Sequence, residues 1–341
     1  MKSRTSVRFI LKQILAAALL LACAHVSLSV SADDRIVLKL GHTLTPESHY
    51  QLTALEFARL VQAGTGGKVE VQVFGQSQLG GEVQMTQALR TGTQEMMISA
   101  QATVANTIKE WQIFDVPYLF GSIEEANRVL QSPVGDKYLA MMQRHNIVGL
   151  AWISAQERDV FTAKKPVVAL SDMAGLKIRV MQSPGYVAAY RSLNANPTPM
   201  AYSQLYLALQ QGLVDGADTS PDQMVLDKFT EVAKFFQLTH VHYLPIVLAI
   251  GKPAWEKLSP EFQQVVRKAA AEAARFDIRE YRRQYDEALL TLPKKGVAVK
   301  SIDAAPWEKM SETARSELLQ KIPDGPALYK EIVAAKTAKA K

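Results

Sequence analysis

The alternation of strand and helix patterns is the feature that most constrains the fold of this chain. Between residues 35 and 100, apolar residues recur first at every second position, as in KVEVQVF, and then at helical spacing. These two periods distinguish half-buried strands from amphipathic helices. The resulting order is strand 35–42, helix 49–67, strand 68–74, helix 80–92 and strand 94–100. This β-α-β-α-β order predicts parallel strands covered by helices.

A second α/β unit follows the first. Its expected strands are 147–154, 158–164, 175–180 and 213–219, and its expected helices are 183–193 and 203–212. The apolar stretch FFQLTHVHYLPIVLAIGK at 235–252 has β character and is interrupted at Pro245. We expect this stretch to cross between two domains.

A long helix is expected after Ser259-Pro260-Glu261, which supplies a cap, a first-turn proline and an acid in the usual order. Its pattern persists to about Leu292, a length of about 50 Å at 1.5 Å per residue. That length exceeds one small domain. We therefore predict a two-domain α/β periplasmic-binding-protein fold with a hinge, crossing strands and a helix that spans both domains. The expected domains are 33–156 plus 245–285, and 157–244 plus 286–341.

The N-terminus has the pattern of an export signal. Lys2, Arg4, Arg8 and Lys12 precede an apolar segment, and Val30-Ser31-Ala32 offers small residues for cleavage. We predict that residues 1–32 are a signal peptide and that the mature protein is periplasmic. Two alternatives stay open, an uncleaved membrane anchor and a lipoprotein in which Cys23 carries the lipid.

The net charge of the mature chain argues against a nucleic-acid-binding surface. The full sequence has 39 basic and 33 acidic residues, and the first 32 residues hold four of the basic ones. The mature chain then has 39 − 4 = 35 basic residues against 33 acidic ones, a net charge near +2. No basic run is interleaved with aromatic residues, so we expect no nucleic-acid partner.

The usual enzymatic signatures are missing from the sequence. GTGGKV lacks the spacing and the Ser/Thr of a phosphate-binding loop, there is no Gly-x-Ser-x-Gly, and the mature chain has no cysteine. His240 and His242 could share one strand face and bind a metal, but two ligands alone are a weak signal. His42 and His49 are expected in a loop or at a pocket rim. We predict no catalytic residue, no cofactor and no metal.

Arg179 is the strongest candidate for a binding residue. It lies near the end of the strand in GLKIRVMQSPGY, just before Ser183 and Pro184, which suit the start of a helix. A guanidinium suits bidentate binding of a carboxylate, and a helix N-terminus adds unpaired N–H groups. We expect both to face an anion in an open, wet cleft. In contrast, the polar segment QERD at 156–159 is expected by default to be exposed to solvent. The tyrosines at helical spacing are expected mostly to pack in the core; they are Tyr186, Tyr190, Tyr202 and Tyr206.

Several segments together resemble the extracytoplasmic solute-binding proteins of tripartite ATP-independent periplasmic (TRAP) transporters, the DctP family. They are LKLGHTLTPESHY, TGGKVEVQVFGQSQLGGE, FDVPYLF, GLKIRV, NPTPMAYSQLYLALQQGLVDGAD and KFTEVAKFF. The resemblance covers nearly all of the mature chain. It implies two α/β domains with a shared long helix, and capture of a small organic acid for delivery to a membrane permease without catalysis.

The resemblance also implies ligand-binding residues. Arg179 matches the arginine of the GLKIR motif that clamps the ligand carboxylate. Arg158 occupies the place of a second arginine, and its alternative role is an ion pair with Glu157 or Asp159. Thr219 stands where the family often has an asparagine. Glu82 follows a glycine turn where the family places ligand-facing groups, although a first-turn Glu also stabilises a helix dipole.

The expected function is that of a monomeric transport receptor that captures a small-molecule carboxylate and hands it to TRAP permease subunits. Two alternatives use the same organic acid: a periplasmic solute sensor, and an α/β enzyme. The sequence does not select among dicarboxylates, sugar acids, keto acids and aromatic acids.

Overall fold

The computed structural model describes residues 35–337. The predicted signal peptide 1–32, including Cys23 and its lipid alternative, lies outside the described residues. Within the described part of the chain, no helix is both long and apolar enough to cross a bilayer.

The strands form one mixed sheet in the order β2-β1-β3-β8-β4-β7-β5-β6, with β9 beside β8. The strands are β1 (Ile36–Gly41), β2 (Val69–Phe74), β3 (Met96–Ala100), β4 (Ile147–Thr162), β5 (Lys177–Val180), β6 (Asn196–Pro199), β7 (Gly216–Thr219), β8 (Phe235–Gly251) and β9 (Ala298–Ser301). The expected parallel pairing is confirmed for β1 with β3 and for β5 with β7. However, β8 is antiparallel to β3 and to β4, and β7 is antiparallel to β4.

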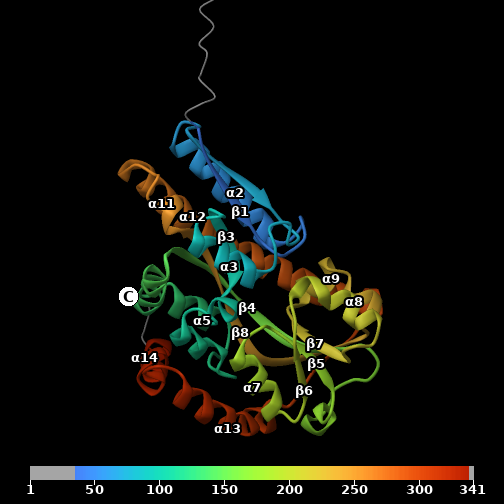
Figure 1. The fold of residues 1–341 in the computed structure, drawn as a ribbon. Helices are drawn as coiled ribbons and strands as arrows, with labels where there is room; N and C mark the ends of the chain where they lie inside the picture. Colours follow the sequence, from blue (N-terminus) through green and yellow to red (C-terminus); the bar gives the residue numbers. More distant parts are fainter. Residues whose placement is uncertain (1–34, 338–341) are drawn as a thin grey trace, which may run out of the picture. The chain divides into compact units, whose positions relative to one another are not determined.

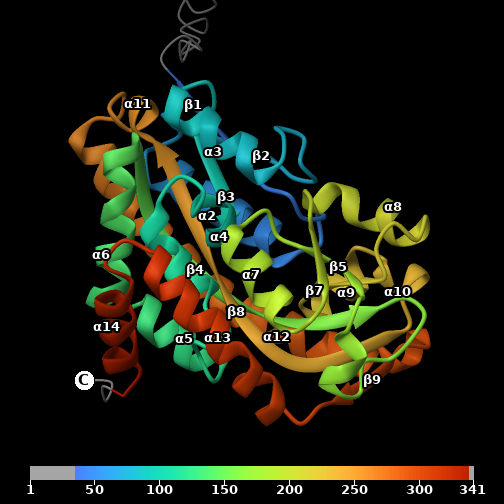
Figure 2. The same ribbon diagram turned by 60° about the horizontal axis from the view of Figure 1, so that its bottom comes forward.

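Two long central strands, β4 and β8, connect the two halves of the sheet, and the sweep of β8 is visible in Figure 2. The expected crossing segment is therefore confirmed, but two of its details were wrong. The segments 147–154 and 158–164 are one strand of 16 residues, and β8 continues through Pro245. Pro245 is tolerated because it pairs with Ala155 at a point where the ladder changes register.

The helices cover the sheet, and the longest of them has the predicted extent. The α-helices are α2 (His49–Gly64), α3 (Glu82–Thr91), α4 (Gln101–Val104), α5 (Ile123–Leu130), α6 (Pro133–Met141), α7 (Pro184–Ser192), α8 (Leu205–Gln210), α9 (Pro221–Leu226), α10 (Phe229–Val232), α11 (Lys252–Trp255), α12 (Pro260–Thr291), α13 (Ala305–Lys321) and α14 (Gly325–Thr337). Helix α12 begins at Pro260 after the Ser259 cap, and it packs against α2, β4 and α9 (Figure 1). It therefore touches elements from both halves of the sheet.

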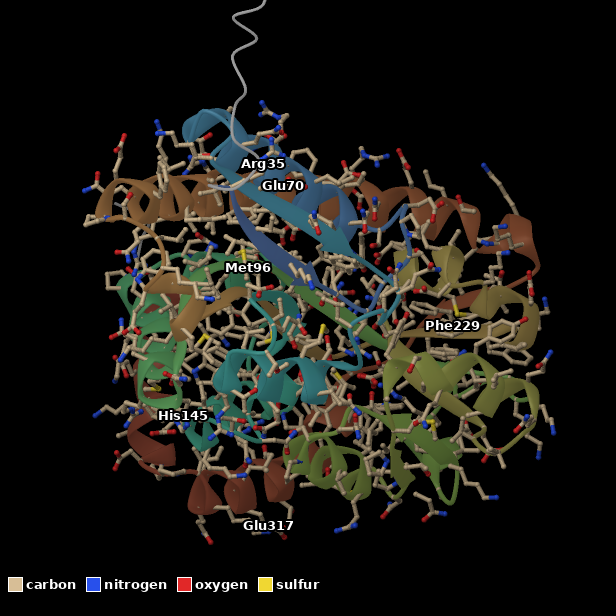
Figure 3. All side chains as sticks on the ribbon, turned by 45° about the horizontal axis from the view of Figure 1, so that its top comes forward. Arg35, Glu70, Met96, His145, Phe229 and Glu317 are labelled. Atoms are coloured by element: carbon tan, nitrogen blue, oxygen red, sulfur yellow. The ribbon has the colours of Figure 1, made fainter. Side chains whose placement is uncertain are left out.

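Apolar clusters fill the interior of the described part of the chain, and two of them lie on different halves of the sheet. The larger includes Trp111 and Trp152, whose rings lie 4.7 Å apart. The smaller gathers around Phe161 and Phe229, and Figure 3 labels Phe229 on α10. Separate apolar clusters joined by crossing strands and a shared helix agree with the two-domain fold expected from the sequence. The domain boundaries given above stay a prediction.

Candidate functional site

The ends of parallel strands from both halves of the sheet meet around one small pocket, with a cavity volume of about 20 Å³. Ligands of open α/β sheets bind at the carboxyl ends of strands in this way. The pocket is lined by Thr43, Leu44, Tyr50, Glu82, Ala100, Gln156, Arg158, Arg179, Met181, Tyr202, Gln223 and Leu244. Three of the four predicted ligand-binding residues, Glu82, Arg158 and Arg179, are therefore brought together here.

Arg179 enters this pocket from the third residue of β5, as the strand pattern predicted. Its side chain is buried, so the expectation of an open, wet cleft was wrong. Nε and Nη2 donate hydrogen bonds of 3.2 and 2.9 Å to the Met200 carbonyl oxygen, whereas Nη1 is buried without a partner. Burial and the neighbouring Arg158 lower the pKa of Arg179 to about 10. An anion at Nη1 would satisfy the free donors and remove this electrostatic penalty.

The helix start near Arg179 has a different role from the one expected. Ser183 caps α7 by accepting a 3.3 Å hydrogen bond from the Gly185 N–H, and its hydroxyl donates to Asp115. Gly185 leaves room for this contact, because a Cβ there would come within 2.4 Å of the Asp115 side chain. The carboxyl group at the start of α7 is thus Asp115, and α7 does not line the pocket. Burial raises the pKa of Asp115 to about 7.

Arg158 forms a buried ion pair, but with neither of the partners considered from the sequence. Its Nε donates to Asp218 Oδ2 at 2.8 Å, and its Nη2 donates to Oδ1 at 3.1 Å and to the Asp218 carbonyl at 2.5 Å. Glu157 and Asp159 are excluded as partners because successive residues of a strand point to opposite faces. The whole QERD run is buried in β4, so its default reading as a solvated charge run was wrong.

Glu82 and Thr219 approach the site in different ways. Glu82 is the first residue of α3, and its Oε1 accepts a 3.0 Å hydrogen bond from the Ala100 N–H. Burial raises the pKa of its carboxyl group despite this bond. Thr219 does not line the pocket; its hydroxyl donates to Gln223 Oε1 at 2.6 Å. The side-chain amide N–H₂ of Gln223 is thereby left to donate elsewhere, and Gln223 does line the pocket.

Gln156 is a lining residue that the sequence reasoning missed. Its side-chain amide lies 2.6 Å from His49 Nε2, and His49 Nδ1 lies 2.8 Å from Asp277 Oδ1. Burial lowers the pKa of His49, but the nearby Asp277 outweighs it and the net shift is upward. The long helix α12 thus supports the pocket through His49. His42 lies in the loop after β1, as expected, whereas His49 is the first residue of α2. Both side chains are fully buried, so neither lies at an exposed rim.

The two histidines of β8 do not share a site. His242 is buried, stacks on Tyr186 with ring centroids 4.3 Å apart, and lies 3.1 Å from the Asp115 carbonyl. His240 has a φ of +51° and lies 2.8 Å from Glu157 Oε1. Because the backbone of His240 departs from the extended conformation, the rings of His240 and His242 do not point to the same face of β8. A metal held by His240 and His242 together is excluded.

The fold and the pocket can now be compared with known proteins. The family model described as bacterial extracellular solute-binding protein, family 7 (DctP) matches residues 40–322. The chain belongs to this family. Its members are solute-binding receptors, and the two-domain fold and the crossing elements described above agree with the membership.

Relatives and solved structures of the family resemble the chain over most of its length. A TRAP periplasmic solute-binding protein from Polaromonas, bound to D-erythronate, is 31% identical with a TM-score of 0.86 and covers 90% of this chain and 100% of its own. The Escherichia coli 2,3-diketo-L-gulonate-binding protein YiaO is 29% identical over 86% of this chain and 90% of its own. The C4-dicarboxylate-binding DctP of Rhodobacter capsulatus is 28% identical over 91% and 95%.

Proposed function

We propose that this protein captures a small hydroxylated monocarboxylate in the pocket around Arg179. The observation that carries the proposal is the buried, unpartnered Nη1 of Arg179. Nε and part of Nη2 are used by the Met200 carbonyl, which fixes the plane of the guanidinium. The ligand carboxylate binds the free Nη1–Nη2 edge as a bidentate partner.

The charges around Arg179 favour one carboxylate over two. Arg158 is neutralised by Asp218 in a buried pair. Arg179 is the remaining cation of the lining, and Glu82 is the remaining acid. A second ligand carboxylate would meet Glu82 without a free arginine to bind it. Dicarboxylates are therefore disfavoured by like-charge repulsion.

The remaining polar groups favour a ligand that carries hydroxyls. Glu82 accepts hydrogen bonds, and the amides of Gln156 and Gln223 can donate or accept them. Several relatives support this choice, whereas the Rhodobacter relative is named for C4-dicarboxylates. The bound molecules include D-erythronate in the Polaromonas protein, galactonate in a 26% identical protein from Advenella mimigardefordensis, and density interpreted as pantoate in a 30% identical protein from Bordetella.

The protein acts by binding and release rather than by catalysis. The pocket has no nucleophile paired with a base, since its lining offers arginines, amides, hydroxyls and one carboxyl group. It delivers the acid to TRAP permease subunits after export and removal of residues 1–32. The same chemistry would serve a solute sensor, and genetic pairing with a permease separates the two roles.

Calorimetric titration of the mature chain with D-erythronate, galactonate, pantoate and succinate tests the binding proposal. At least one hydroxylated monocarboxylate is expected to bind much more tightly than succinate, with one site per chain. Each acid is recovered after a long incubation and compared with the starting compound, and no conversion is expected. Tighter binding of succinate than of every monocarboxylate contradicts the ligand class, and conversion contradicts the receptor function.

Export and closure have tests of their own. Intact mass of protein from the periplasm should correspond to a chain that begins near Asp33, and a lipid-modified start at Cys23 would contradict this.

Because both domains contact one ligand, binding favours a closed arrangement by its differential affinity. Small-angle scattering should show a smaller radius of gyration with the bound acid, and an unchanged curve at saturation would contradict closure.

A further inference from the structure

A second polar cluster lies outside the ligand pocket. Glu157, Asp159 and His240 each offer one ligand atom, and these atoms lie within 4.8 Å of one another. Glu157 and Asp159 flank Arg158 along β4, so strand alternation places them on the opposite face from the pocket. None of the three lines the ligand pocket: Glu157 and Asp159 lie on β4, and His240 lies on β8.

The two carboxyl groups of this cluster lack a permanent cationic partner. The Glu157 side chain is 7% exposed and that of Asp159 is fully buried, and the described residues place no lysine or arginine within 4 Å of either. Their cationic neighbour is His240, which titrates. In addition, Asp159 Oδ2 is buried without a hydrogen-bond partner. Buried carboxyl groups are normally paired, bound to a metal or protonated, and a cation bound here would satisfy both acids.

We propose that Glu157, Asp159 and His240 bind a divalent transition-metal cation, with Zn²⁺ the ion that best fits the donor set. Two carboxylates and one imidazole are ligands that Zn²⁺ takes, and three protein ligands leave a fourth position for water. Two carboxylates also neutralise the dication. Ca²⁺ and Mg²⁺ fit less well, because they prefer more oxygen ligands and do not favour imidazole.

The distances within the cluster suit a tetrahedral ion. Ligand atoms about 2.0–2.1 Å from a tetrahedral Zn²⁺ lie roughly 3.3 Å from one another. His240 Nδ1 lies 2.8 Å from Glu157 Oε1 and 3.7 Å from Asp159 Oδ1, so the donors bracket this separation. Small side-chain rotations bring them to it, and the ion then replaces the hydrogen bond between His240 and Glu157.

Neighbouring groups already orient the two acids. The Tyr285 hydroxyl donates to Glu157 Oε1 at 2.6 Å. The backbone N–H groups of Thr239 and His240 donate to Asp159 Oδ1 at 2.7 and 2.8 Å, which fixes the orientation of this carboxyl group. Hydrogen bonds of this kind to ligating groups fix their orientation in metal sites. The His240 side chain is 41% exposed and opens to a cavity of about 560 Å³, which gives the ion a path of entry.

The backbone at His240 gives separate support. Its φ of +51° lies in the left-handed region, which is uncommon for residues other than glycine. The same segment contains the register change between β4 and β8 near Arg158 and Val160. Strained residues persist where the surroundings enforce them, and they cluster at binding sites. Here the conformation turns the imidazole away from the strand and onto the acids.

Calorimetric titration with Zn²⁺ tests the proposal on mature protein freed of metal with a chelator. The parent is expected to bind one Zn²⁺ per chain, with little response to Ca²⁺ or Mg²⁺. His240→Asn should lose this site, because asparagine keeps the left-handed backbone but is a poor Zn²⁺ ligand. The matched control is His145→Asn, since His145 lies outside the cluster at the surface (Figure 3). The control should bind Zn²⁺ as the parent does.

X-ray absorption at the zinc edge should show only nitrogen and oxygen ligands in the loaded parent. The proposal is overturned if the parent binds no Zn²⁺, or if His240→Asn binds it as tightly as the parent and His145→Asn do. Titration of the organic acid into His240→Asn keeps the two hypotheses separate. Acid binding is expected to persist there, whatever the zinc result, because the cluster and the pocket lie on opposite faces of β4.

Discussion

Replacing Asp218 by asparagine removes one charge from the buried pair that holds Arg158 in place. Asparagine has nearly the same shape as aspartate, so the substitution tests charge rather than packing. Both side chains are almost completely buried, and two N–H groups of the guanidinium contact the carboxylate at 2.8 and 3.1 Å. The variant leaves Arg158 charged, buried and close to Arg179, whose pKa Arg158 already lowers.

The expected loss of unfolding free energy in Asp218→Asn is about 3–5 kcal/mol, the usual cost of breaking a buried pair by removing one partner. A typical domain is stable by about 5–15 kcal/mol, so the loss is a large share of the total. The loss depends on pH. Burial alone would raise the pKa of Asp218, but Arg158 outweighs burial and lowers it. The contribution is therefore present above the unfolded pKa of about 3.9 and is lost as the pH falls through the folded pKa.

Urea unfolding of parent and variant, followed by tryptophan fluorescence at pH 7 and at about pH 3, below the unfolded pKa, measures this loss. The matched control is Asp286→Asn, which breaks an exposed pair with Arg282 at 3.0 Å and should cost at most about 0.5 kcal/mol. A difference below about 1 kcal/mol between Asp218→Asn and the parent at pH 7 would refute the reasoning. So would a difference that grows as the pH falls.

Three further substitutions probe the site and its surroundings. Glu82→Gln should lower the affinity for hydroxylated acids more than the affinity for unhydroxylated acids such as propionate, as measured by calorimetry. An equal effect on both would contradict a hydroxyl contact. Thr219→Val removes the hydroxyl that orients Gln223 and should lower affinity about fivefold, the equivalent of about 1 kcal/mol; unchanged affinity argues against this indirect role. Asp115→Asn should flatten the pH dependence of stability in urea unfolding. The pKa of Asp115 is raised to about 7, so the folded protein binds a proton that the unfolded chain releases near 3.9, and stability falls as the pH rises between these values. Equal slopes of unfolding free energy against pH for variant and parent would contradict this role of Asp115.

The layered fold was predictable because its signals are local. Period-2 and helical patterns located β1 to β3 with α2 and α3, and the Ser259 cap located the start of α12. The sequence failed at β4, where four polar residues in a row, 156–159, suggested a break between two strands. These side chains are buried because distant partners such as Asp218 and Tyr285 satisfy them. A local pattern cannot show such partners.

The same distinction holds for the binding site. Arg179 was predictable, since a cation at a strand end before a helix is unusual. Gln156 and Gln223 were not, because isolated glutamines have no distinctive pattern and their side chains are positioned by the distant His49 and by Thr219. Strand β6 was missed because its Asn-Pro-Thr-Pro sequence reads as a turn. Its prolines are accepted because β6 ends the sheet order and only one of its edges is paired.

Calorimetric titration of Arg179→Ala and Arg179→Lys, beside the parent, tests the central claim most directly. The ligand is whichever hydroxylated acid binds the parent best, and the control is Arg144→Lys, a substitution in an exposed pair with Glu110. Loss of a buried partner of a carboxylate costs about 2–5 kcal/mol, so Arg179→Ala should bind roughly 30-fold to several thousand-fold more weakly. Arg179→Lys should also lose most of the affinity, because an ammonium keeps the charge but not the planar fork. Both variants should remain folded without ligand. Binding by Arg179→Lys within about threefold of the parent would contradict bidentate capture by Arg179.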